Sequence, residues 1–402
     1  MIASAAILQV NKFFWPKGGA DQHFLELIGL LADHGQYVIP FSMQLAGGEL
    51  RTLELKQREL YEAHKKWFVS YLDFSDKSTL FEQLRRMIWS REARQQLSGL
   101  LNHYRSLGVV PRVAHIHNIY HQLSPSIFAA LEDRKIPTVM TVHDFGIFDT
   151  SLATSFAERI GWATELLFHQ SIYKRHIDRY IAPSMYVQQR LEAAGIAAEK
   201  VRIIPHFLEL TSTQRNQYVK LEKHQQIVYV GRLSKEKGVD IALQAFIQSD
   251  YDGSLCIIGD GPMRNELEAA AKRASHQRGS KSIRFTGFLN KEAVYREVAQ
   301  SELSVFPSRI PETFGLGAAE SLLLGTPVVA PALGAFPELI RNGVDGMLLS
   351  AHPSIREYAM AFTNLTLDQR TLDQMSDKAQ QTSCVLTKEQ YYEKLMEVYK
   401  EL

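Results

Sequence analysis

Residues 311–331, with the sequence PETFGLGAAESLLLGTPVVAP, join a loop that carries a glutamate to an apolar helix and a proline-led strand. We expect the helix to begin at Phe314 or Gly315, which puts Glu312 just outside it and Glu320 inside it. The first backbone N–H groups of a helix have no partner within the helix, and with the helix dipole they attract anions. Because Gly315 has no side chain, a ligand can approach these groups closely, and the stretch predicts an anion site.

The spacing of the two carboxylates indicates what kind of anion fits. Eight residues at helical rise span roughly 12 Å, which is about the reach of a sugar, a diphosphate and a ribose laid end to end. A carboxylate at each end can accept hydrogen bonds from hydroxyl groups while the helix start holds the phosphates. For this stretch alone an alternative stays open, namely a helix with an acidic first turn and a buried, paired Glu320.

A second loop, residues 230–240 with the sequence VGRLSKEKGVD, also favours a diphosphate. It follows a predicted strand, so Arg232 and Lys237 are expected beyond the carboxyl edge of a sheet. Two cations there suit a diphosphate, and Gly231 and Gly238 leave the backbone free to turn. Surface charge explains this loop equally well when it is taken alone, but two such features in one chain favour a diphosphate ligand.

Short β-rich runs alternate with helical runs along the chain, a pattern typical of parallel α/β sheets. Five strands are expected in the first half, at residues 5–10, 36–43, 113–118, 138–144 and 178–184. Five more are expected in the second half, at residues 226–232, 254–261, 282–288, 303–308 and 326–331. The alternation therefore predicts two doubly wound, Rossmann-like α/β domains.

The length of 402 residues favours two domains rather than one core. A polar, weakly periodic stretch at residues 206–226 is expected to link them. The predicted domains are 1–207 and 208–386, followed by a final helix over 387–402. Ligands of such sheets bind beyond the carboxyl ends of the strands, so we expect the site in a cleft between two facing domains.

The composition excludes several classes of protein. A net charge of +1 gives no reason to expect nucleic acid as a partner. The two cysteines, Cys256 and Cys384, are too few for a disulfide framework or a multi-thiolate metal site and fit a reducing cytoplasm. The apolar residues 1–10 have no basic region and predict a strand rather than a signal peptide. No run approaches the roughly 18 apolar residues of a membrane span.

Residues 51–112 are more basic than the rest of the chain, with 12 lysines and arginines against 7 acidic residues. Within them, residues 84–97 mix four arginines with Met87, Ile88 and Trp89. A solvated amphipathic helix explains this mixture. Adhesion to an anionic membrane surface is the alternative, because helices with basic and large apolar side chains bind such surfaces.

Histidines gather near the ends of two predicted strands in the first half. His115 and His117 alternate along one strand and His121 follows it, whereas His143 stands beside Asp144 at the carboxyl end of the next. A zinc site of three histidines is an alternative, but the alternation and the lack of an H-E-x-x-H spacing argue against it. His143, which should face the ligand cleft, is the better candidate for function.

Three further motifs carry weaker signals. Residues 256–267, CIIGDGPMRNEL, resemble a dinucleotide fingerprint but lack its third glycine, which argues against a nicotinamide cofactor. Asp250 and Asp252 have the spacing of a metal-binding pair, but a turn before a strand explains them. Gly18 and Gly19 precede a predicted helix and form either an anion or sugar contact or a simple tight turn.

Taken together, these motifs resemble the GT-B glycosyltransferases, specifically the large retaining family called family 4. The resemblance covers nearly the whole chain and depends on the order and spacing of the motifs rather than on any single one. One departure is His206-Phe207, where many relatives have Asn-Gly. The motifs are GGA at 18–20, HIHNIYHQLSPS at 115–126, HD at 143–144, APS at 182–184, GRLSKEKG at 231–238, GDGP at 259–262, TGFL at 286–289, VFPS at 305–308, the glutamate pair, and GTPVVA at 325–330.

The resemblance makes 208–386 the nucleotide-sugar domain and 1–207 the acceptor domain. Arg232 and Lys237 would hold the diphosphate. Glu312 would bind hydroxyl groups of the donor sugar, and His143 would face that sugar from the first domain. The other implied donor contacts are Gly19 and Leu316 near the phosphates, the backbone amides of Phe314 and Gly315 at the sugar, Glu320 at the ribose, and Phe288 and Leu289 beside the base.

The family pattern implies a hexosyltransferase that moves a sugar from a nucleoside diphosphate to an acceptor hydroxyl with retention of anomeric configuration. It requires no metal, because cationic side chains supply the positive charge, and no cofactor other than the donor. The implied partners are the nucleotide sugar and a saccharide or lipid-linked acceptor of surface polysaccharide or glycolipid synthesis. We expect a cytoplasmic enzyme, with peripheral contact at the inner face of the membrane as a hypothesis.

The resemblance also implies that the final helix, 387–402, crosses back to the first domain. Three alternatives stay open. A GT-B phosphorylase or a sugar-nucleotide epimerase would use the same cleft, and a non-catalytic sugar-nucleotide-binding protein would belong to another class. The last of these is disfavoured by the presence of Arg232, Lys237, Glu312, Glu320 and His143.

Overall fold

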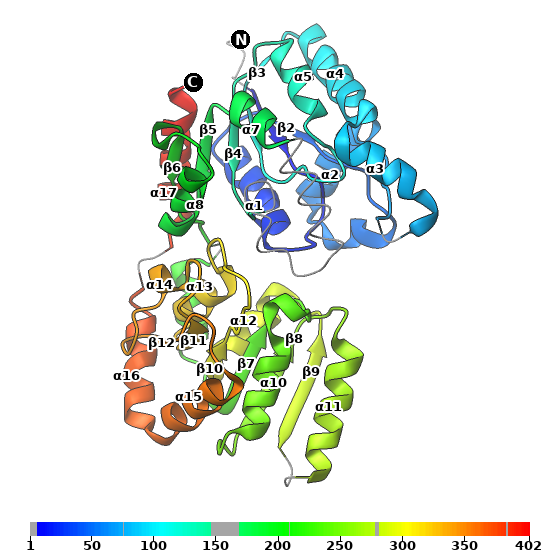
Figure 1. Cartoon of the computed structure of the whole chain (residues 1–402). Helices are drawn as coiled ribbons and strands as arrows, with labels where there is room; N and C mark the ends of the chain where they lie inside the picture. Colours follow the sequence, from blue (N-terminus) through cyan, green and yellow to red (C-terminus); the bar gives the residue numbers. More distant parts are fainter. Residues whose placement is uncertain (1–5, 75, 146–168, 209, 278–280, 383–384) are drawn as a thin grey trace. The chain divides into compact units, whose positions relative to one another are not determined.

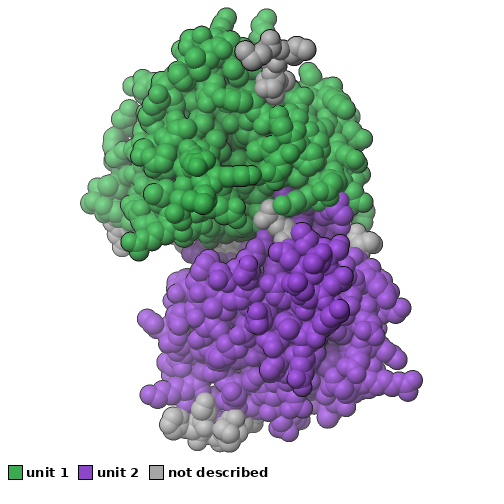
Figure 2. All heavy atoms as spheres, turned by 180° about the vertical axis from the view of Figure 1, so that it is seen from behind, with its two compact units in different colours: residues 1–206, 388–402 green, residues 207–387 purple. Residues whose placement is uncertain are grey.

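The computed structural model describes the chain except for residues 1–5, 75, 146–168, 209, 278–280 and 383–384 (Figure 1). The chain divides into two compact units, coloured separately in Figure 2. Unit 1 consists of Met1–His206 together with Lys388–Leu402, and unit 2 of Phe207–Thr387. Cys256 is buried as a free thiol, whereas Cys384 lies outside the described residues.

Unit 1 is built on a six-stranded parallel sheet with the strand order β2-β1-β3-β4-β5-β6. Every residue of the central strand β1 is buried, as expected for a strand covered by helices on both faces. The strands are β1 (Ala6–Val10), β2 (Val38–Phe41), β3 (Pro111–Ile116), β4 (Thr138–Thr141), β5 (Arg179–Ala182) and β6 (Val201–Ile203). The helices are α1 (Gly19–Asp33), α2 (Leu55–His64), α3 (Leu80–Ile88), α4 (Arg91–Ser106), α5 (Ser126–Glu132), α7 (Gln170–His176), α8 (Met185–Ala193) and α17 (Lys388–Lys400).

Unit 2 has its own six-stranded parallel sheet, in the order β12-β11-β10-β7-β8-β9. Alternate residues of β7 reach opposite faces, since Ile227 and Tyr229 join one apolar core and Val228 another. The strands are β7 (His224–Val230), β8 (Ser254–Ile258), β9 (Ser282–Gly287), β10 (Ser301–Val305), β11 (Val328–Pro331) and β12 (Gly346–Leu349). The helices are α9 (Ser212–Tyr218), α10 (Val239–Gln248), α11 (Arg264–Gln277), α12 (Lys291–Ala299), α13 (Leu316–Leu323), α14 (Phe336–Leu339), α15 (Ile355–Leu367) and α16 (Gln369–Ala379).

The ten strands predicted from the sequence are all present, as β1–β5 and β7–β11. The prediction missed β6 and β12, which are the strands at one edge of each sheet. Both are only three or four residues long, which is too short for a pattern of apolar and polar residues to identify them. Such strands are defined by their pairing with a neighbour, which a local pattern does not report.

The stretch predicted as a linker, residues 206–226, contains some regular secondary structure. Residues Ser212–Tyr218 form α9, which lies against α12. A capping box between Thr211 and Gln214 starts the helix, and His224 already belongs to β7. The polar composition concealed a short surface helix.

The C-terminal helix α17 packs on unit 1. The Tyr399 hydroxyl lies 2.6 Å from Nδ1 of His115, on β3. Beyond the helix, the carboxylate of Glu401 pairs with Arg179 at 2.9 Å and with Arg202 at 2.7 Å. These contacts tie the end of the chain to strands β3, β5 and β6.

The basic residues 84–97 do not form one helix. Helix α3 ends at Ile88, and α4 begins at Arg91 with the side chain of Ser90 as its N-cap. Arg86 and Met87 are buried, whereas Ile88 and Trp89 are exposed. A single solvated amphipathic helix is therefore not what this sequence forms. In the part of the chain that the structure describes, no helix is long and apolar enough to cross a membrane.

Candidate functional site

The strand order of unit 2 reverses between β7 and β10. From β7 the sheet continues through β8 to β9 on one side and through β10 to β11 and β12 on the other. Open parallel sheets bind ligands beyond the carboxyl ends of the strands at such a reversal. The loop after β7 carries Arg232 and Lys237, and the loop after β10 carries Glu312. The fold thus brings together two loops that the sequence singles out separately.

Gly238 allows these two loops to touch. Its φ is +68°, in the left-handed region, and a Cβ atom there would lie 1.8 Å from the carbonyl oxygen of Pro307. No side chain larger than hydrogen fits this approach without movement of the backbone. The close packing places Lys237, the preceding residue, against the loop that follows β10.

Lys237 and Glu312 form an ion pair across the two loops. The Lys237 ammonium donates a hydrogen bond of 2.7 Å to Oε1 of Glu312, and the Ser308 hydroxyl donates one of 2.9 Å to the same oxygen. The side chains of Lys237 and Glu312 are 36% and 20% exposed, so solvent and ligands can reach the pair. A diphosphate at Lys237 and sugar hydroxyls at Glu312 would therefore find both groups already oriented.

A second ion pair, between Arg309 and Asp240, also joins the loop after β10 to the segment after β7. The Arg309 guanidinium donates to both carboxylate oxygens of Asp240 at 2.7 Å and to the backbone carbonyl of Lys235 at 2.6 Å. Burial opposes ionisation of Asp240, but the hydrogen bonds and charge of Arg309 outweigh it and lower the pKa of this carboxyl. This two-pronged contact fixes the position of the Lys237 loop.

Helix α13 begins at Leu316, with Gly315 as its N-cap at φ +89°. The predicted start at Phe314 or Gly315 is therefore early, and the residues from Glu312 to Gly315 are not helical. The estimate of roughly 12 Å from helical rise does not hold for this segment, because only its second half is helical. Phe314 is buried and Leu316 is partly buried, so their backbone amides rather than their side chains remain candidates for ligand contact.

Glu320 lies one turn into α13 and is partly exposed. The Tyr295 hydroxyl, from α12, donates a hydrogen bond of 3.0 Å to Oε1 of Glu320. This contact orients the carboxylate. Glu320 is therefore paired, as in the alternative interpretation, but it is not buried.

Three further predicted donor contacts differ in exposure. Arg232 is exposed, and no acidic side chain of the described residues pairs with its guanidinium. Phe288 follows β9 and is 78% exposed, whereas Leu289 packs against the core under α12. An aromatic ring left so exposed beyond the end of a strand is suited to stack on a planar base.

Unit 1 contains the other two predicted residues, Gly19 and His143. Gly19 is the exposed first residue of α1, and His143 follows β4. Nδ1 of His117 lies 3.0 Å from Nε2 of His143, and the rings of His143 and His206 stack at 5.3 Å. Burial of most of its ring lowers the pKa of His143 to about 3. The ring is therefore neutral at pH 7 and suited to hydrogen bonding rather than to supplying charge.

The surrounding histidines form a closed set of buried rings. His115 lies 2.7 Å from the Thr141 hydroxyl in addition to its contact with α17, and His117 lies 3.0 Å from Oε1 of Gln9. His23, on α1, lies 4.1 Å from His206 between ring centroids. Within the described residues, no group of three or more histidine, cysteine or acidic side chains has the arrangement to hold a metal ion.

Sequence reasoning missed the residues that support the predicted site residues. Tyr295 orients Glu320, Ser308 donates to Glu312, and Arg309 braces Asp240. Ser308 and Arg309 follow the strand directly, so their place beside the predicted site was a usable signal. Tyr295 stands 25 positions before Glu320, and no local pattern links the two residues.

Two family models match the chain. The model described as Glycosyltransferase Family 4 matches residues 17–212. The model described as Glycosyl transferases group 1 matches residues 211–382. The two matches meet near the boundary between unit 1 and unit 2 and together leave only the ends of the chain unmatched.

Curated relatives match over shorter segments. An uncharacterized 41.2 kDa protein in the cps region of Klebsiella pneumoniae is 26% identical over 233 residues, which are 56% of this chain and 60% of that protein. A GDP-mannose-dependent alpha-(1-6)-phosphatidylinositol dimannoside mannosyltransferase of Mycobacterium tuberculosis is 39% identical over 118 residues, 28% of this chain and 29% of that protein. In both cases the match covers less than two thirds of the relative.

A solved structure matches over the full length. Anabaena HepE, crystallised with UDP and glucose, has a TM-score of 0.71 and 19% sequence identity, and the match covers 99% of this chain and 100% of that one. At this identity the likeness concerns the fold, and it agrees with the two parallel six-stranded sheets flanked by helices.

Proposed function

The chain belongs to the GT-B glycosyltransferases of the family 4, group 1 type, as its motifs predict, and from this premise we propose its reaction. We propose that it transfers a hexosyl group from a nucleoside-diphosphate sugar to an acceptor hydroxyl with retention of anomeric configuration. The observation that carries the proposal is the meeting of Lys237 and Glu312 where the strand order of unit 2 reverses. A cation for phosphates and a carboxylate for sugar hydroxyls stand there side by side.

In the proposed reaction, the bond between the sugar C1 and the diphosphate oxygen breaks while the acceptor oxygen bonds to C1 from the same face. The acceptor proton passes to the departing diphosphate. Arg232, Lys237 and the backbone amides at Gly315 stabilise the negative charge that develops on the leaving group. A metal ion commonly stabilises a departing diphosphate, and we assign this stabilisation to these two side chains and the backbone amides instead.

The remaining donor contacts are proposed from the family pattern. Glu312 orients the sugar by accepting hydrogen bonds from its hydroxyls, which holds C1 for attack. Glu320, held by Tyr295, accepts from the ribose, and Phe288 stacks on the base. HepE, a structural neighbour, was crystallised with UDP and glucose, which supports a nucleotide sugar as the donor class. His143 is proposed to hydrogen-bond the sugar through its neutral ring.

The experiment that tests this function is thermal unfolding against UDP-, GDP-, ADP- and dTDP-sugars in the presence of EDTA. A ligand at 100 times its Kd stabilises the folded state by about 2.7 kcal/mol, which is a readable shift. We expect one nucleotide sugar to give this shift and Arg232→Ala to abolish it. No shift with any of the four bases would remove the main support for the proposal.

Product analysis separates the alternatives. A transferase releases nucleoside diphosphate only when an acceptor is present, apart from slow hydrolysis. An epimerase changes the sugar without an acceptor, and a phosphorylase requires inorganic phosphate. A binding protein gives the thermal shift and no product at all, which would exclude catalysis.

We further propose that the acceptor belongs to surface polysaccharide or glycolipid synthesis and that the enzyme works in the cytoplasm against the inner face of the membrane. On α3, Leu80, Phe81, Leu84 and Ile88 are exposed on adjacent turns, Phe81 at 82%. Arg85 and Arg91 are exposed beside them. Apolar side chains flanked by cations suit an anionic lipid surface.

Co-sedimentation with vesicles tests this placement. We expect binding to vesicles with an anionic lipid and weaker binding to neutral ones, with Phe81→Ser reducing the first. Leu367→Ser is the matched control, because Leu367 is 78% exposed but lies in unit 2. Equal partitioning into anionic and neutral vesicles would contradict the proposed surface.

A further inference from the structure

Unit 1 contains a pocket at its own strand-order reversal. Its sheet runs from β1 to β2 on one side and from β1 through β3 to β6 on the other. A pocket of about 320 Å³ opens there between three segments: the loop after β1, residues 71–74, and residues 120–122 after β3. This volume lies at the lower end of ligand pockets, and it suits one sugar ring with a substituent rather than an oligosaccharide.

The loop after β1 contributes two cations held against aromatic rings. Nζ of Lys12 lies 5.3 Å from the ring centroid of Phe13 and 5.4 Å from that of Tyr120. Nζ of Lys17 lies 4.6 Å from the ring of Phe13. Cation–π attraction keeps both ammonium groups at the pocket instead of leaving them to move freely in solvent.

The opposite wall adds two more rings and one acid. Tyr71 and Phe74 line the pocket together with Asp73, the one carboxylate against the two lysines among the lining residues. The charged lining therefore has an excess of positive charge. Aromatic faces suit the C–H faces of a sugar ring, and ammonium groups suit phosphate oxygens.

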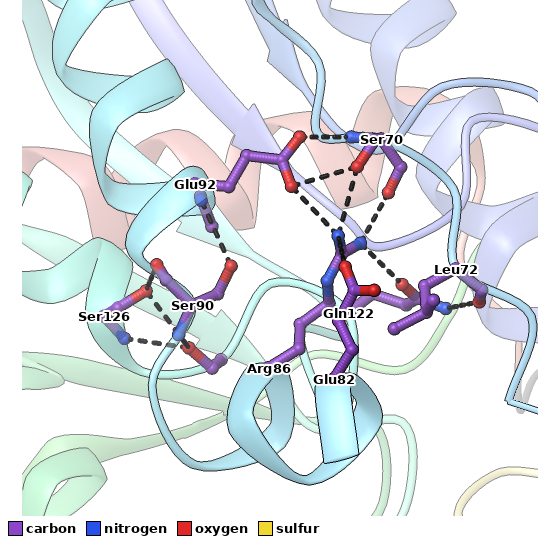
Figure 3. A network of polar contacts seen from close by, with 10 residues as sticks. Ser70, Leu72, Glu82, Arg86, Ser90, Glu92, Gln122 and Ser126 are labelled. Atoms are coloured by element: carbon purple, nitrogen blue, oxygen red, sulfur yellow. Dashed lines mark hydrogen bonds and ion pairs between the residues drawn. The ribbon is translucent and has the colours of Figure 1, made fainter. Parts of the chain in front are cut away.

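Polar contacts around the buried guanidinium of Arg86 fix this wall in place (Figure 3). The guanidinium of Arg86, which is 6% exposed, donates to the backbone carbonyl and the hydroxyl of Ser70 and pairs with Glu92 at 2.9 Å. Glu92 in turn accepts from the backbone N–H of Ser70 at 2.7 Å. The Gln122 amide donates 2.7 Å to the carbonyl of Leu72. The wall is thus attached both to α3 and α4 and to the segment after β3.

The third segment has an unusual backbone. His121 has a φ of +64°, in the left-handed region that residues other than glycine seldom adopt. Such strain costs of order 1 kcal/mol or more and persists mainly where a site requires it. The left-handed conformation of His121 forms the turn that carries Tyr120 to Lys12 and Gln122 to Leu72.

We propose that this pocket is the acceptor subsite and that it binds a sugar carrying a phosphate or diphosphate group. The sugar ring lies on the aromatic residues, and the phosphate is bound by Lys12 and Lys17. A phosphate would offer both ammonium groups an anionic ligand, which a neutral saccharide lacks. The inference rests on the proposed transferase function for the term acceptor, whereas the binding of a sugar phosphate can be tested on its own.

The test compares the binding of sugars and of nucleotides to variants of the pocket and to variants of the donor site. Calorimetric titration measures α-D-glucose 1-phosphate, glucose, UDP and GDP against the wild type, Lys12→Gln/Lys17→Gln and Arg232→Ala/Lys237→Ala. We expect the lysine pair variant to lose about tenfold or more in affinity for glucose 1-phosphate and to keep its nucleotide affinity. The donor-site variant should show the reverse. Lys56→Gln, a change at an exposed lysine outside the pocket, should alter neither affinity.

Two results would overturn the proposal. One is equal affinity of the wild type for glucose and glucose 1-phosphate. The other is a loss of glucose 1-phosphate binding in the donor-site variant alone. A third result would separate the two proposals. If the lysine pair variant alone loses affinity for glucose 1-phosphate, and neither UDP nor GDP binds the wild type or any variant, the sugar-phosphate site is supported and the proposed transferase function fails.

A further probe identifies the source of the phosphate. Dodecyl diphosphate-linked glucose carries the same head group on an apolar chain. Affinity at least tenfold above that of glucose 1-phosphate, lost in Phe81→Ser, would assign the acceptor to a lipid. Equal affinities for the two probes would assign the acceptor to a soluble sugar phosphate. In both cases Lys17→Glu should weaken binding of the phosphate-bearing probe more than Lys17→Gln does.

Discussion

The two strand-order reversals of the molecule are built in different ways. In unit 2, the loops after β7 and β10 touch through backbone atoms at Gly238 and Pro307, and short motifs supply the charged groups. In unit 1, the loop after β1 meets segments around residues 72 and 121, and the charges and rings come from all three. The first is a tight backbone arrangement with few side chains, and the second is an assembly of many side chains.

This difference has a functional meaning. A nucleoside diphosphate is the common part of many donors, and a backbone-defined site can bind it with little variation. An acceptor differs from one enzyme to the next, and a site made of side chains from distant segments can be altered without disturbing the sheet. The proposed division of donor and acceptor binding between the units can therefore be tested by changes that affect one reversal and not the other.

The largest effect is expected at Lys237. Lys237→Met removes the cation proposed to stabilise the leaving diphosphate, and we expect kcat/KM to fall by about 10²–10³-fold, as for removal of one transition-state donor. Release of nucleoside diphosphate in the presence of acceptor measures the rate. Lys235→Met is the matched control, since Lys235 is an exposed lysine two positions earlier on the same loop. Equal losses in the two variants would argue that only the net charge of the loop matters.

Gly238→Ala is expected to have the next largest effect, on stability. The new Cβ meets a backbone oxygen at 1.8 Å and also requires a left-handed φ, so unit 2 should lose about 3 kcal/mol of unfolding free energy. Gly343→Ala is the control, because Gly343 has a φ of +75° and no atom within 4 Å of its added Cβ, and it should cost about 1 kcal/mol. Denaturant unfolding followed by circular dichroism measures both. Similar losses would mean that the contact between the two loops is not required.

The same contrast explains how far the sequence predicts the molecule. The ten predicted strands are correct because their signals are local. The run from Arg232 to Gly238 is an equally local signal, and its role in donor binding stays a prediction. Strands β6 and β12 were missed because only pairing at a sheet edge defines them. The start of α13 was placed early because Gly315 takes a left-handed conformation that ends the loop rather than beginning the helix.

The pocket of unit 1 was not predictable in the same way. Lys12, Tyr71 and His121 are far apart in the sequence, and no local spacing links the three residues. The basic character of residues 84–97 was visible, but Arg86 is buried as a brace rather than displayed on a surface. Which of several arginines turns inward depends on Ser70 and Glu92, and only the folded chain brings these together.

Lowering the pH should reduce the unfolding free energy of unit 1 more than that of unit 2. Burial lowers the pKa of His115 to about 3, while the same ring in the unfolded chain titrates near its ordinary value of 6.5. A folded-state pKa below the unfolded one gives stability that is present above pH 6.5 and lost as the pH falls, because the unfolded chain then binds the proton. Between pH 6.5 and pH 5, His115 alone should cost about 2 kcal/mol. The pKa of His23, His117 and His206 is lowered by burial in the same direction.

Tryptophan fluorescence measures this effect in unit 1 alone. The four tryptophans, at positions 15, 67, 89 and 162, all fall within Met1–His206. We expect the fluorescence-detected unfolding midpoint to drop between pH 7 and pH 5 by more than the midpoint detected by far-ultraviolet circular dichroism, which reports on both units. A fluorescence midpoint that does not change with pH would contradict the role of the buried histidines.

The smallest effect is expected at Arg86, and it bears most directly on the comparison. Arg86→Lys keeps the charge but cannot make the forked contacts to Ser70 and Glu92, so the wall of residues 71–74 should loosen. We expect the KM for the acceptor to rise by roughly three- to tenfold, in line with the loss of one or two charge-assisted hydrogen bonds, with the donor KM unchanged. Arg94→Lys is the control, since Arg94 is exposed and pairs only loosely with Asp133 at 3.6 Å. A rise in the donor KM as well would mean that the two reversals are coupled through the fold, and that the acceptor pocket cannot be varied independently of the donor site.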